Sequence, residues 1–195
     1  MGLKIGIAGP VGSGKTSIIE KLTNILKEKY TLGIVTNDIY TTEDANYLKD
    51  KLDLNKDQII GVETGGCPHT AIRDDISMNQ KAVEQLEKKF NPDIIFVESG
   101  GDNLSATFSY ELIDYYFYVI DVAQGADIPR KKGAGLLFSD LLVINKIDLC
   151  PYVNVDLKSF KSDVKNNRKN KPSIFLTNKE DESFEKLKEW IEALV

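Results

Sequence analysis

The residues best suited to chemistry lie in a glycine-rich segment near the amino terminus. Residues 9–16 read GPVGSGKT and fit the pattern G-x-x-x-x-G-K-[ST], which binds nucleotide phosphates between a strand and a helix. The glycines let successive backbone N–H groups turn toward phosphate oxygens, and a plain glycine turn would not need the rest of the pattern. Lys15 can reach the β- and γ-phosphates, and the Thr16 hydroxyl is a hard ligand for Mg²⁺. We predict nucleotide binding by Gly9, Pro10, Val11, Gly12, Ser13, Gly14, Lys15 and Thr16.

A second motif, Asn145-Lys146-Ile-Asp148, follows a late apolar run and concerns the base. The Asp148 carboxylate can accept two hydrogen bonds from guanine, from its ring N–H and its exocyclic amine, whereas adenine offers no such pair. The Lys146 stem can cover the base, and Asn145 can tie its loop to the phosphate loop. Alone, this four-residue pattern is often a plain turn, but behind a phosphate loop it predicts GTP and GDP as ligands. Thr177 and Asn178 are candidates for a further contact on the base side.

Four acidic residues follow other predicted strands: Asp38, Glu63, Glu98 and Asp102. The carboxyl ends of parallel strands converge on the ligand crevice, although each acid alone would more often be a solvated loop residue. We expect Asp38, Glu63 and Glu98 to join Thr16 around Mg²⁺, directly or through water. Lys15, Asp38 and Glu98 are the predicted catalytic residues for GTP hydrolysis.

The loop after Glu98 also contributes to the phosphate end of the site. The backbone N–H groups of Gly100 and Gly101 can reach the γ-phosphate. No arginine is placed as a finger, since Arg130 suits a partner-facing or solvated role better. We therefore expect slow hydrolysis by the isolated chain.

Cys67 and His69 form a candidate metal-binding pair, with Pro68 between them. A residue before proline favours extended backbone, in which residues i and i+2 point to the same side. A thiolate and an imidazole suit Ni²⁺, Cu or Zn²⁺. His69 is the single histidine and Cys150 the other cysteine, so a four-coordinate ion would need the same pair from a second chain. The alternative, a cysteine packed in a loop beside an incidental histidine, stays open at this point.

Alternating strands and helices must position these motifs. Apolar runs predict strands over 3–8, 31–36, 59–62, 94–98, 115–122, 141–145 and 173–177. Helical spacing of apolar residues predicts helices over 15–29 and 71–90 and near the carboxyl terminus, with a polar helix and loop in 154–171. This order predicts the α/β class: a mainly parallel sheet flanked by helices, as in a P-loop NTPase, in one domain over 1–195.

Composition narrows the class of protein further. The chain of 195 residues has 25 Lys and Arg against 30 Asp and Glu, a net charge of −5 without a long basic run, so a nucleic-acid surface is not expected. Two cysteines do not make a disulfide framework and indicate a reducing compartment. With no long apolar stretch or export signal, we expect a cytoplasmic protein with no membrane contact.

Together these motifs resemble the urease accessory GTPase family, UreG, over nearly the whole chain. The resemblance is carried by residues 9–16, 36–41, 61–73, 98–104 and 139–149, which include the specific Cys-Pro-His segment. It implies a dimerising P-loop GTPase that delivers nickel during urease maturation. In that family the pair corresponding to Cys67 and His69 holds Ni²⁺ between two protomers of a GTP-bound homodimer. The implied partners are the other urease accessory proteins and apo-urease.

Three other interpretations remain at this stage. A hydrogenase-type nickel-insertion GTPase would share the architecture, but such chains often carry additional ligands near the amino terminus, and none precedes residue 67 here. A P-loop small-molecule kinase is disfavoured by the guanine motif. A passive metal-binding scaffold would bind nickel with an affinity that GTP does not change.

Overall fold

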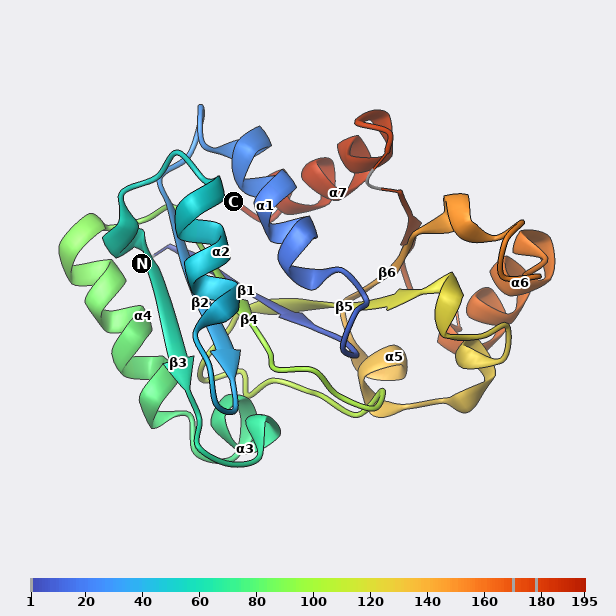
Figure 1. Ribbon diagram of the computed structural model, residues 1–195, viewed down its shortest axis with the longest axis horizontal. Coiled ribbons are helices and arrows are strands. Elements are labelled where there is room, and N and C mark those ends of the chain that lie inside the picture. Colours follow the sequence, from blue (N-terminus) through green and yellow to red (C-terminus); the bar gives the residue numbers. More distant parts are fainter. Residues whose placement is uncertain (1, 170, 178) are drawn as a thin grey trace.

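A seven-stranded sheet runs through the centre of the molecule (Figure 1). The computed structural model describes residues 2–169, 171–177 and 179–195. The strand order is β3-β2-β4-β1-β5-β6-β7, and every neighbouring pair is parallel. The strands are β1 (Leu3–Ala8), β2 (Leu32–Asp38), β3 (Ile59–Glu63), β4 (Ile94–Glu98), β5 (Tyr115–Asp121), β6 (Leu141–Asn145) and β7 (Ser173–Phe175). The predicted α/β class with a parallel sheet is confirmed.

The central strands are apolar on both faces, which requires helices on both sides of the sheet. In β4, Ile94 and Phe96 face one core, whereas Ile95 and Val97 face the other. All four side chains are fully buried. The alternation therefore divides the interior into two cores, one on each face of the sheet.

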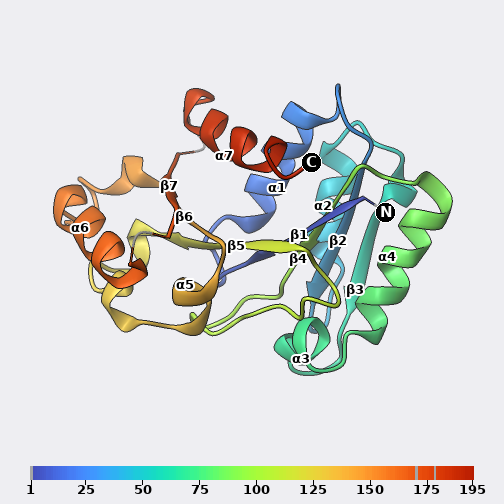
Figure 2. The same ribbon diagram turned by 180° about the vertical axis from the view of Figure 1, so that it is seen from behind.

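Helices cover both faces of the sheet (Figures 1 and 2). The helices between residues 15 and 90 lie beside strands β1 to β4. One core receives apolar side chains from α1, α2 and α7, and the other from α3, α4, α5 and α6. The helices are α1 (Lys15–Leu26), α2 (Glu43–Lys51), α3 (Pro68–Arg73), α4 (Ser77–Phe90), α5 (Ala134–Phe138), α6 (Leu157–Arg168) and α7 (Glu182–Glu192). No helix of the described residues is long and apolar enough to cross a membrane.

The prediction of one helix over 71–90 is wrong, because the segment forms two helices with a break between them. The backbone N–H groups of Asp74 and Asp75 both donate to the Thr70 carbonyl, which closes α3. The Asp75 carboxylate then accepts a hydrogen bond of 3.2 Å from the Ser77 N–H at the start of α4. A local turn with its own hydrogen bonds thus interrupts the continuous apolar spacing.

Other boundaries differ by a few residues. Helix α1 ends at Leu26 instead of residue 29, and the Lys29 N–H bonds to the Leu26 carbonyl three residues back, which is the tighter pattern of a 3-10 turn. Strand β5 ends at Asp121, whose carboxylate accepts a hydrogen bond of 2.7 Å from the Ala123 N–H and starts a 3-10 turn. Strand β2 runs two residues further than expected, to Asp38. This extension carries Asp38 to the edge of the ligand site.

Candidate nucleotide and metal site

The phosphate loop connects β1 to α1 and depends on glycine at three positions. Gly9, Gly12 and Gly14 have φ angles of 152°, 75° and 96°, which side-chain-bearing residues rarely adopt. A Cβ on Gly14 would lie 2.4 Å from Asn145 Nδ2, and one on Gly9 would lie 2.2 Å from the Val119 carbonyl oxygen. The loop therefore takes the shape of a cradle that its neighbours enclose on two sides.

Lys15 and Thr16 point from the start of α1 into this loop region. The Lys15 ammonium is nearly buried and donates hydrogen bonds of 3.0 Å and 3.3 Å to the carbonyl oxygens of Gly9 and Pro10. Thr16 Oγ1 donates a hydrogen bond of 2.8 Å to Glu98 Oε1. A buried cation and a helix amino terminus thus meet at one point, which favours the binding of phosphate.

Glu98 provides the strongest indication of a cation site. Its side chain is 1% exposed, and Oε2 has no hydrogen-bond partner among the residues that the structure describes. Burial raises the pKa of Glu98 to about 7, although Lys15 and the Thr16 hydroxyl act in the opposite direction. A buried carboxylate with an unused oxygen beside a threonine hydroxyl fits the hard oxygen ligands that Mg²⁺ prefers.

A cavity of about 540 Å³ lies above these groups, a size typical of small-molecule sites. Its lining includes the phosphate loop, Asp38, Glu98, Gly100 and Gly101. Asp44, in the first turn of α2, also lines it, although it was not predicted as a site residue. An acid at a helix start behind two threonines was the signal that could have found it.

The other two acids do not line this cavity. Glu63 is exposed at the end of edge strand β3, in register with Asp38. Asp102 is buried and accepts hydrogen bonds from the Tyr118 hydroxyl and from the Ser105 N–H, the latter at 2.9 Å. Asp102 therefore fixes the loop after β4, whereas Asp38 and Glu98 face the cavity together.

The base-side motif is attached directly to the phosphate loop. Asn145 Nδ2 donates a hydrogen bond of 3.0 Å to the Ser13 carbonyl oxygen. Lys146 Nζ donates to the Gly12 carbonyl oxygen and forms an ion pair of 3.1 Å with Asp121. Asp121 was not predicted as a site residue, because its place inside an expected strand hid the acid at the strand end. These bonds place the two motifs on one rigid support.

Asp148, the residue expected to read guanine, already has two partners in the chain. Thr177 Oγ1 donates a hydrogen bond of 2.7 Å to one carboxylate oxygen, and Lys179 lies 2.7 Å from the other. Lys179 and then Thr177 lower the pKa of Asp148, so the carboxylate stays charged. The structure brings Thr177 and Asp148 together, and Asn178 lies outside the described residues.

Cys67 and His69 meet at the start of α3, but not on the extended segment that was predicted. Cys67 has extended backbone, whereas Pro68 begins the helix and His69 lies in its first turn. The exposed Cys67 Sγ lies 3.5 Å from His69 Nδ1. This contact is the main reason that the pKa of Cys67 falls to about 7. His69 Nε2 is buried and has no hydrogen-bond partner within the described ranges.

The two ligand atoms have the separation that one ion would require. Metal bonds of about 2.3 Å to sulfur and about 2.0 Å to nitrogen, at a tetrahedral angle, give an S···N distance of about 3.5 Å. The described residues contain no group of three or more His, Cys, Asp or Glu side chains that could hold a metal. A single chain therefore supplies a pair of ligands and not a closed site.

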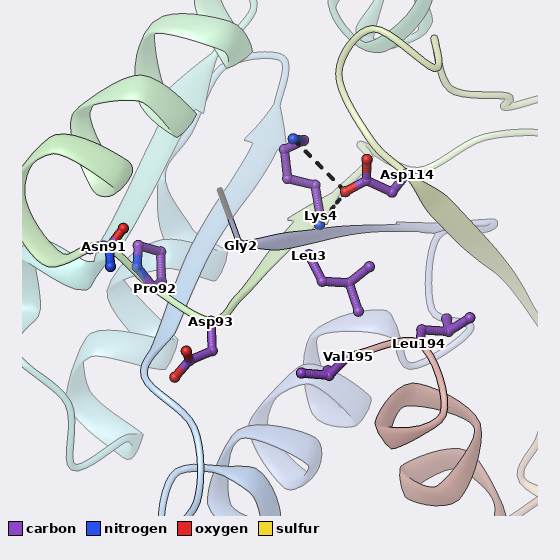
Figure 3. Close-up of a pocket in the computed structure, with 9 residues that line it drawn as sticks. All are labelled: Gly2, Leu3, Lys4, Asn91, Pro92, Asp93, Asp114, Leu194 and Val195. Atoms are coloured by element: carbon purple, nitrogen blue, oxygen red, sulfur yellow. Dashed lines mark hydrogen bonds and ion pairs between the residues drawn. The ribbon is translucent and has the colours of Figure 1, made fainter.

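A larger cavity, of about 620 Å³, lies at the opposite end of the sheet (Figure 3). It is lined by the start of β1, the segment before β4 and the last residues of the chain. Lys4 and Asp114 interact there through an ion pair of 3.8 Å. Ligands of open α/β sheets bind at the carboxyl ends of the strands. This cavity lies at the amino ends of β1 and β4, so it is not the predicted nucleotide site.

The parallel sheet and the phosphate loop define a P-loop nucleotide-binding protein. Residues 3–175 match the family described as CobW/HypB/UreG, nucleotide-binding domain. The chain is 77% identical to the urease accessory protein UreG of Aliarcobacter butzleri over 195 residues, 100% of both chains. It is 57% identical to that of Lysinibacillus sphaericus over 191 residues, 97% of this chain and 91% of the relative. The chain belongs to the CobW/HypB/UreG family, within its UreG branch.

Two solved structures show the same fold. HypB from Helicobacter pylori, in complex with nickel, has a TM-score of 0.81 and 23% identity and covers 98% of this chain and 86% of its own. The hydrogenase maturation factor HypB of Archaeoglobus fulgidus has a TM-score of 0.78 and 23% identity, covering 99% and 90%. The architecture is therefore shared even where most residues differ.

Proposed function

We propose that this chain is a GTP-dependent nickel carrier that serves urease maturation in the cytoplasm. The observation that carries the proposal is the Cys67–His69 pair, which is spaced for one ion and lies at the start of α3, where Pro68 packs against Gly100 of the nucleotide cavity. The curated UreG relatives are described as urease accessory proteins, which supports urease over hydrogenase as the final acceptor. A family neighbour of the same fold is described in complex with nickel.

The nucleotide is GTP or GDP, with its phosphates in the cradle of residues 9–16. Asp148 reads guanine, Lys146 covers the base and Thr177 holds the Asp148 carboxylate in place. Asn178 remains a predicted contact on the base side. Thr16 and Glu98 would hold Mg²⁺, with Asp38 and Glu63 contributing directly or through water. When bound, Mg²⁺ offsets negative charge on the β- and γ-phosphates.

Hydrolysis requires a positioned water and stabilisation of the charge on the γ-phosphate. Lys15 contacts the phosphate oxygens, Asp38 orients the attacking water and Glu98 completes the polar wall of the site. Arg130 forms an exposed ion pair of 2.6 Å with Asp163, so it is engaged on the surface instead of in the cavity. The isolated chain therefore hydrolyses GTP slowly, and the accessory complex accelerates the reaction.

Nickel binding requires two copies of the chain. Each copy contributes Cys67 and His69, and the four ligands surround one Ni²⁺ across a two-fold axis. GTP orders the loops at the cavity and so favours the homodimer, whereas hydrolysis weakens it and releases nickel to apo-urease through the other accessory proteins. Zn²⁺ fits the same ligand set and would compete.

The test is the mass of the protein in solution with GDP or a non-hydrolysable GTP analogue, each with and without Ni²⁺. We expect a dimer when the GTP analogue and Ni²⁺ are both present. Cys67→Ala and His69→Ala should remain monomeric while binding GDP normally, and Cys150→Ala is the matched control because that thiol is buried elsewhere. Dimers of both variants that equal those of the parent chain would refute the shared metal site.

A further inference from the structure

Two buried asparagines, Asn37 and Asn79, form a reciprocal pair between the sheet and α4. Each Nδ2 donates a hydrogen bond of 2.8 Å to the Oδ1 of the other. Asn37 is 1% exposed and Asn79 is completely buried. Asn37 lines the nucleotide cavity and precedes Asp38, whereas Asn79 has no contact with that cavity.

The remaining bonds of this pair reach the two functional segments. Asn37 Nδ2 also donates a hydrogen bond of 2.9 Å to the Glu98 carbonyl oxygen at the end of β4. Asn79 Nδ2 donates one of 2.8 Å to the Ala71 carbonyl oxygen in α3. A continuous chain of hydrogen bonds thus runs from the lining of the nucleotide cavity to the helix that bears His69.

A direct packing contact connects the same two segments. A Cβ on Gly100 would lie 2.7 Å from Pro68 Cβ, so the glycine allows the loop after β4 to lie against the proline between the two metal ligands. Pro68 is itself buried. The loop that faces the γ-phosphate and the loop that carries the metal pair therefore cannot move independently.

Burying two asparagines in a core is unfavourable compared with burying apolar side chains. Burying an amide is unfavourable unless all its polar atoms are bonded, and an apolar pair of similar volume would pack as well. Here the bonds join β2 to α4, β2 to the end of β4, and α4 to α3, so together they connect the nucleotide site to α3. Such a fully satisfied network fixes one relative arrangement of its members.

We propose that Asn79 is a positioning residue that couples the nucleotide site to the Cys67–His69 pair. Asn37 senses the end of β4, and Asn79 transmits that position to α3 through the Ala71 carbonyl. Nickel affinity then depends on whether GTP or GDP is bound. This proposal rests on the proposed function, because it concerns the same metal pair.

The experiment compares nickel dissociation constants in the GDP state and in the state with the GTP analogue and Mg²⁺. In the wild-type chain the nickel dissociation constants of the two states should differ, and their ratio is the quantity to compare between variants. Asn79→Ala and the volume-conserving Asn79→Leu should reduce that ratio by about fivefold or more, while GDP binding stays close to the parent value. Gln80→Ala is the matched control, because Gln80 is exposed on the adjacent position of α4 and should keep the full ratio.

A second measurement uses the unaltered chain and avoids any folding defect of the variants. Amide hydrogen exchange across α3 and the first turn of α4 should slow together when the GTP analogue replaces GDP. The proposal is overturned if exchange in α3 is the same in both states, or if the Asn79 variants lose thermal stability but keep the wild-type ratio. A wild-type chain with no ratio at all would instead refute the proposed carrier function.

Discussion

The Lys179 ammonium lies 2.7 Å from the Asp148 carboxylate, which is the group expected to bind guanine. The Lys179 side chain is 71% exposed and can leave when a base arrives. Because guanine must displace this ammonium, we expect Lys179→Ala to strengthen GDP binding by up to about fivefold, the range of an exposed ion pair. Titration calorimetry at low salt measures the change.

Salt provides an independent check of the same interaction. Added salt screens the Lys179–Asp148 pair, so the difference between wild type and Lys179→Ala should shrink as ionic strength rises. Lys186→Ala, on the exposed side of α7, is the control for the loss of one positive charge. Weaker GDP binding by Lys179→Ala would mean that the lysine assists the base instead of competing with it.

The glycines of the phosphate loop allow a test of the hydrogen bond that joins this loop to the Asn145–Asp148 motif. Gly12 and Gly14 both have positive φ, but a Cβ on Gly12 meets nothing within 4 Å, whereas one on Gly14 meets Asn145. Gly12→Ala should cost about 1–2 kcal/mol from backbone strain alone. Gly14→Ala should cost about 1–3 kcal/mol more, because it also breaks the buried Asn145–Ser13 bond.

Urea unfolding of the nucleotide-free protein measures both values. Gly14→Ala should also abolish GDP binding, since its side chain displaces Asn145 from the loop. Equal losses of stability in the two variants would show that Asn145 can move away from a Cβ at position 14 without lowering the free energy of unfolding.

Glu98→Gln should stabilise the nucleotide-free protein at neutral and higher pH. Burial raises the pKa of Glu98 from 4.5 to about 7, so below pH 4.5 the group is neutral in both the folded and unfolded states. As pH rises to 7 the unfolded state releases its proton first, and the folded state loses roughly 3 kcal/mol of stability. Glutamine removes this loss while it prevents tight Mg²⁺ binding.

Unfolding free energies between pH 4.5 and 8 distinguish the variants. Glu98→Gln should diverge from wild type as pH rises, whereas the exposed Glu189→Gln should follow wild type throughout. Parallel curves for wild type and Glu98→Gln would show that the carboxylate is already compensated in the free protein.

The two cysteines should differ strongly in reactivity. His69 is the main cause that lowers the pKa of the exposed Cys67 thiol to about 7, whereas burial raises that of Cys150. Alkylation of Cys67 by iodoacetamide in the metal-free chain should therefore increase with a midpoint near pH 7, while Cys150 stays protected. His69→Ala should move the midpoint toward the ordinary value of about 8.5. Peptide mass mapping assigns the modified residue, and an unchanged midpoint would remove His69 as the cause.

Much of the fold could be predicted because buried parallel strands are short continuous apolar runs. The bounds of β1, β4 and β6 agree with the sequence-based prediction for this reason. Helix α2 was missed because only Ala45 and Leu48 are buried in it, too few to make a periodic pattern. The break between α3 and α4 was missed because the turn at Asp75 depends on local hydrogen bonds instead of on hydrophobic spacing.

In the site, too, motifs that are continuous in sequence could be predicted, whereas contacts between residues far apart in sequence could not. The phosphate loop and the motif at Asn145–Asp148 are continuous in sequence, so their residue types alone indicate their chemistry. The Asn37–Asn79 pair joins residues that are 42 positions apart, and no pattern in either segment indicates the other. Lys179 is an ordinary surface lysine in sequence, and only the fold brings it to Asp148.

The central position of β1 determines when the protein can first bind its ligand during synthesis. This earliest strand pairs with β4 and β5, so its ladder is incomplete until Tyr118, the partner of Ala8, has left the ribosome. Val119 forms a wall behind Gly9, and Asn145 anchors Ser13 later still. Pairing over such long sequence separations forms slowly and late. Capture of a nucleotide by a nascent chain would therefore mark the point at which most of the sheet has assembled.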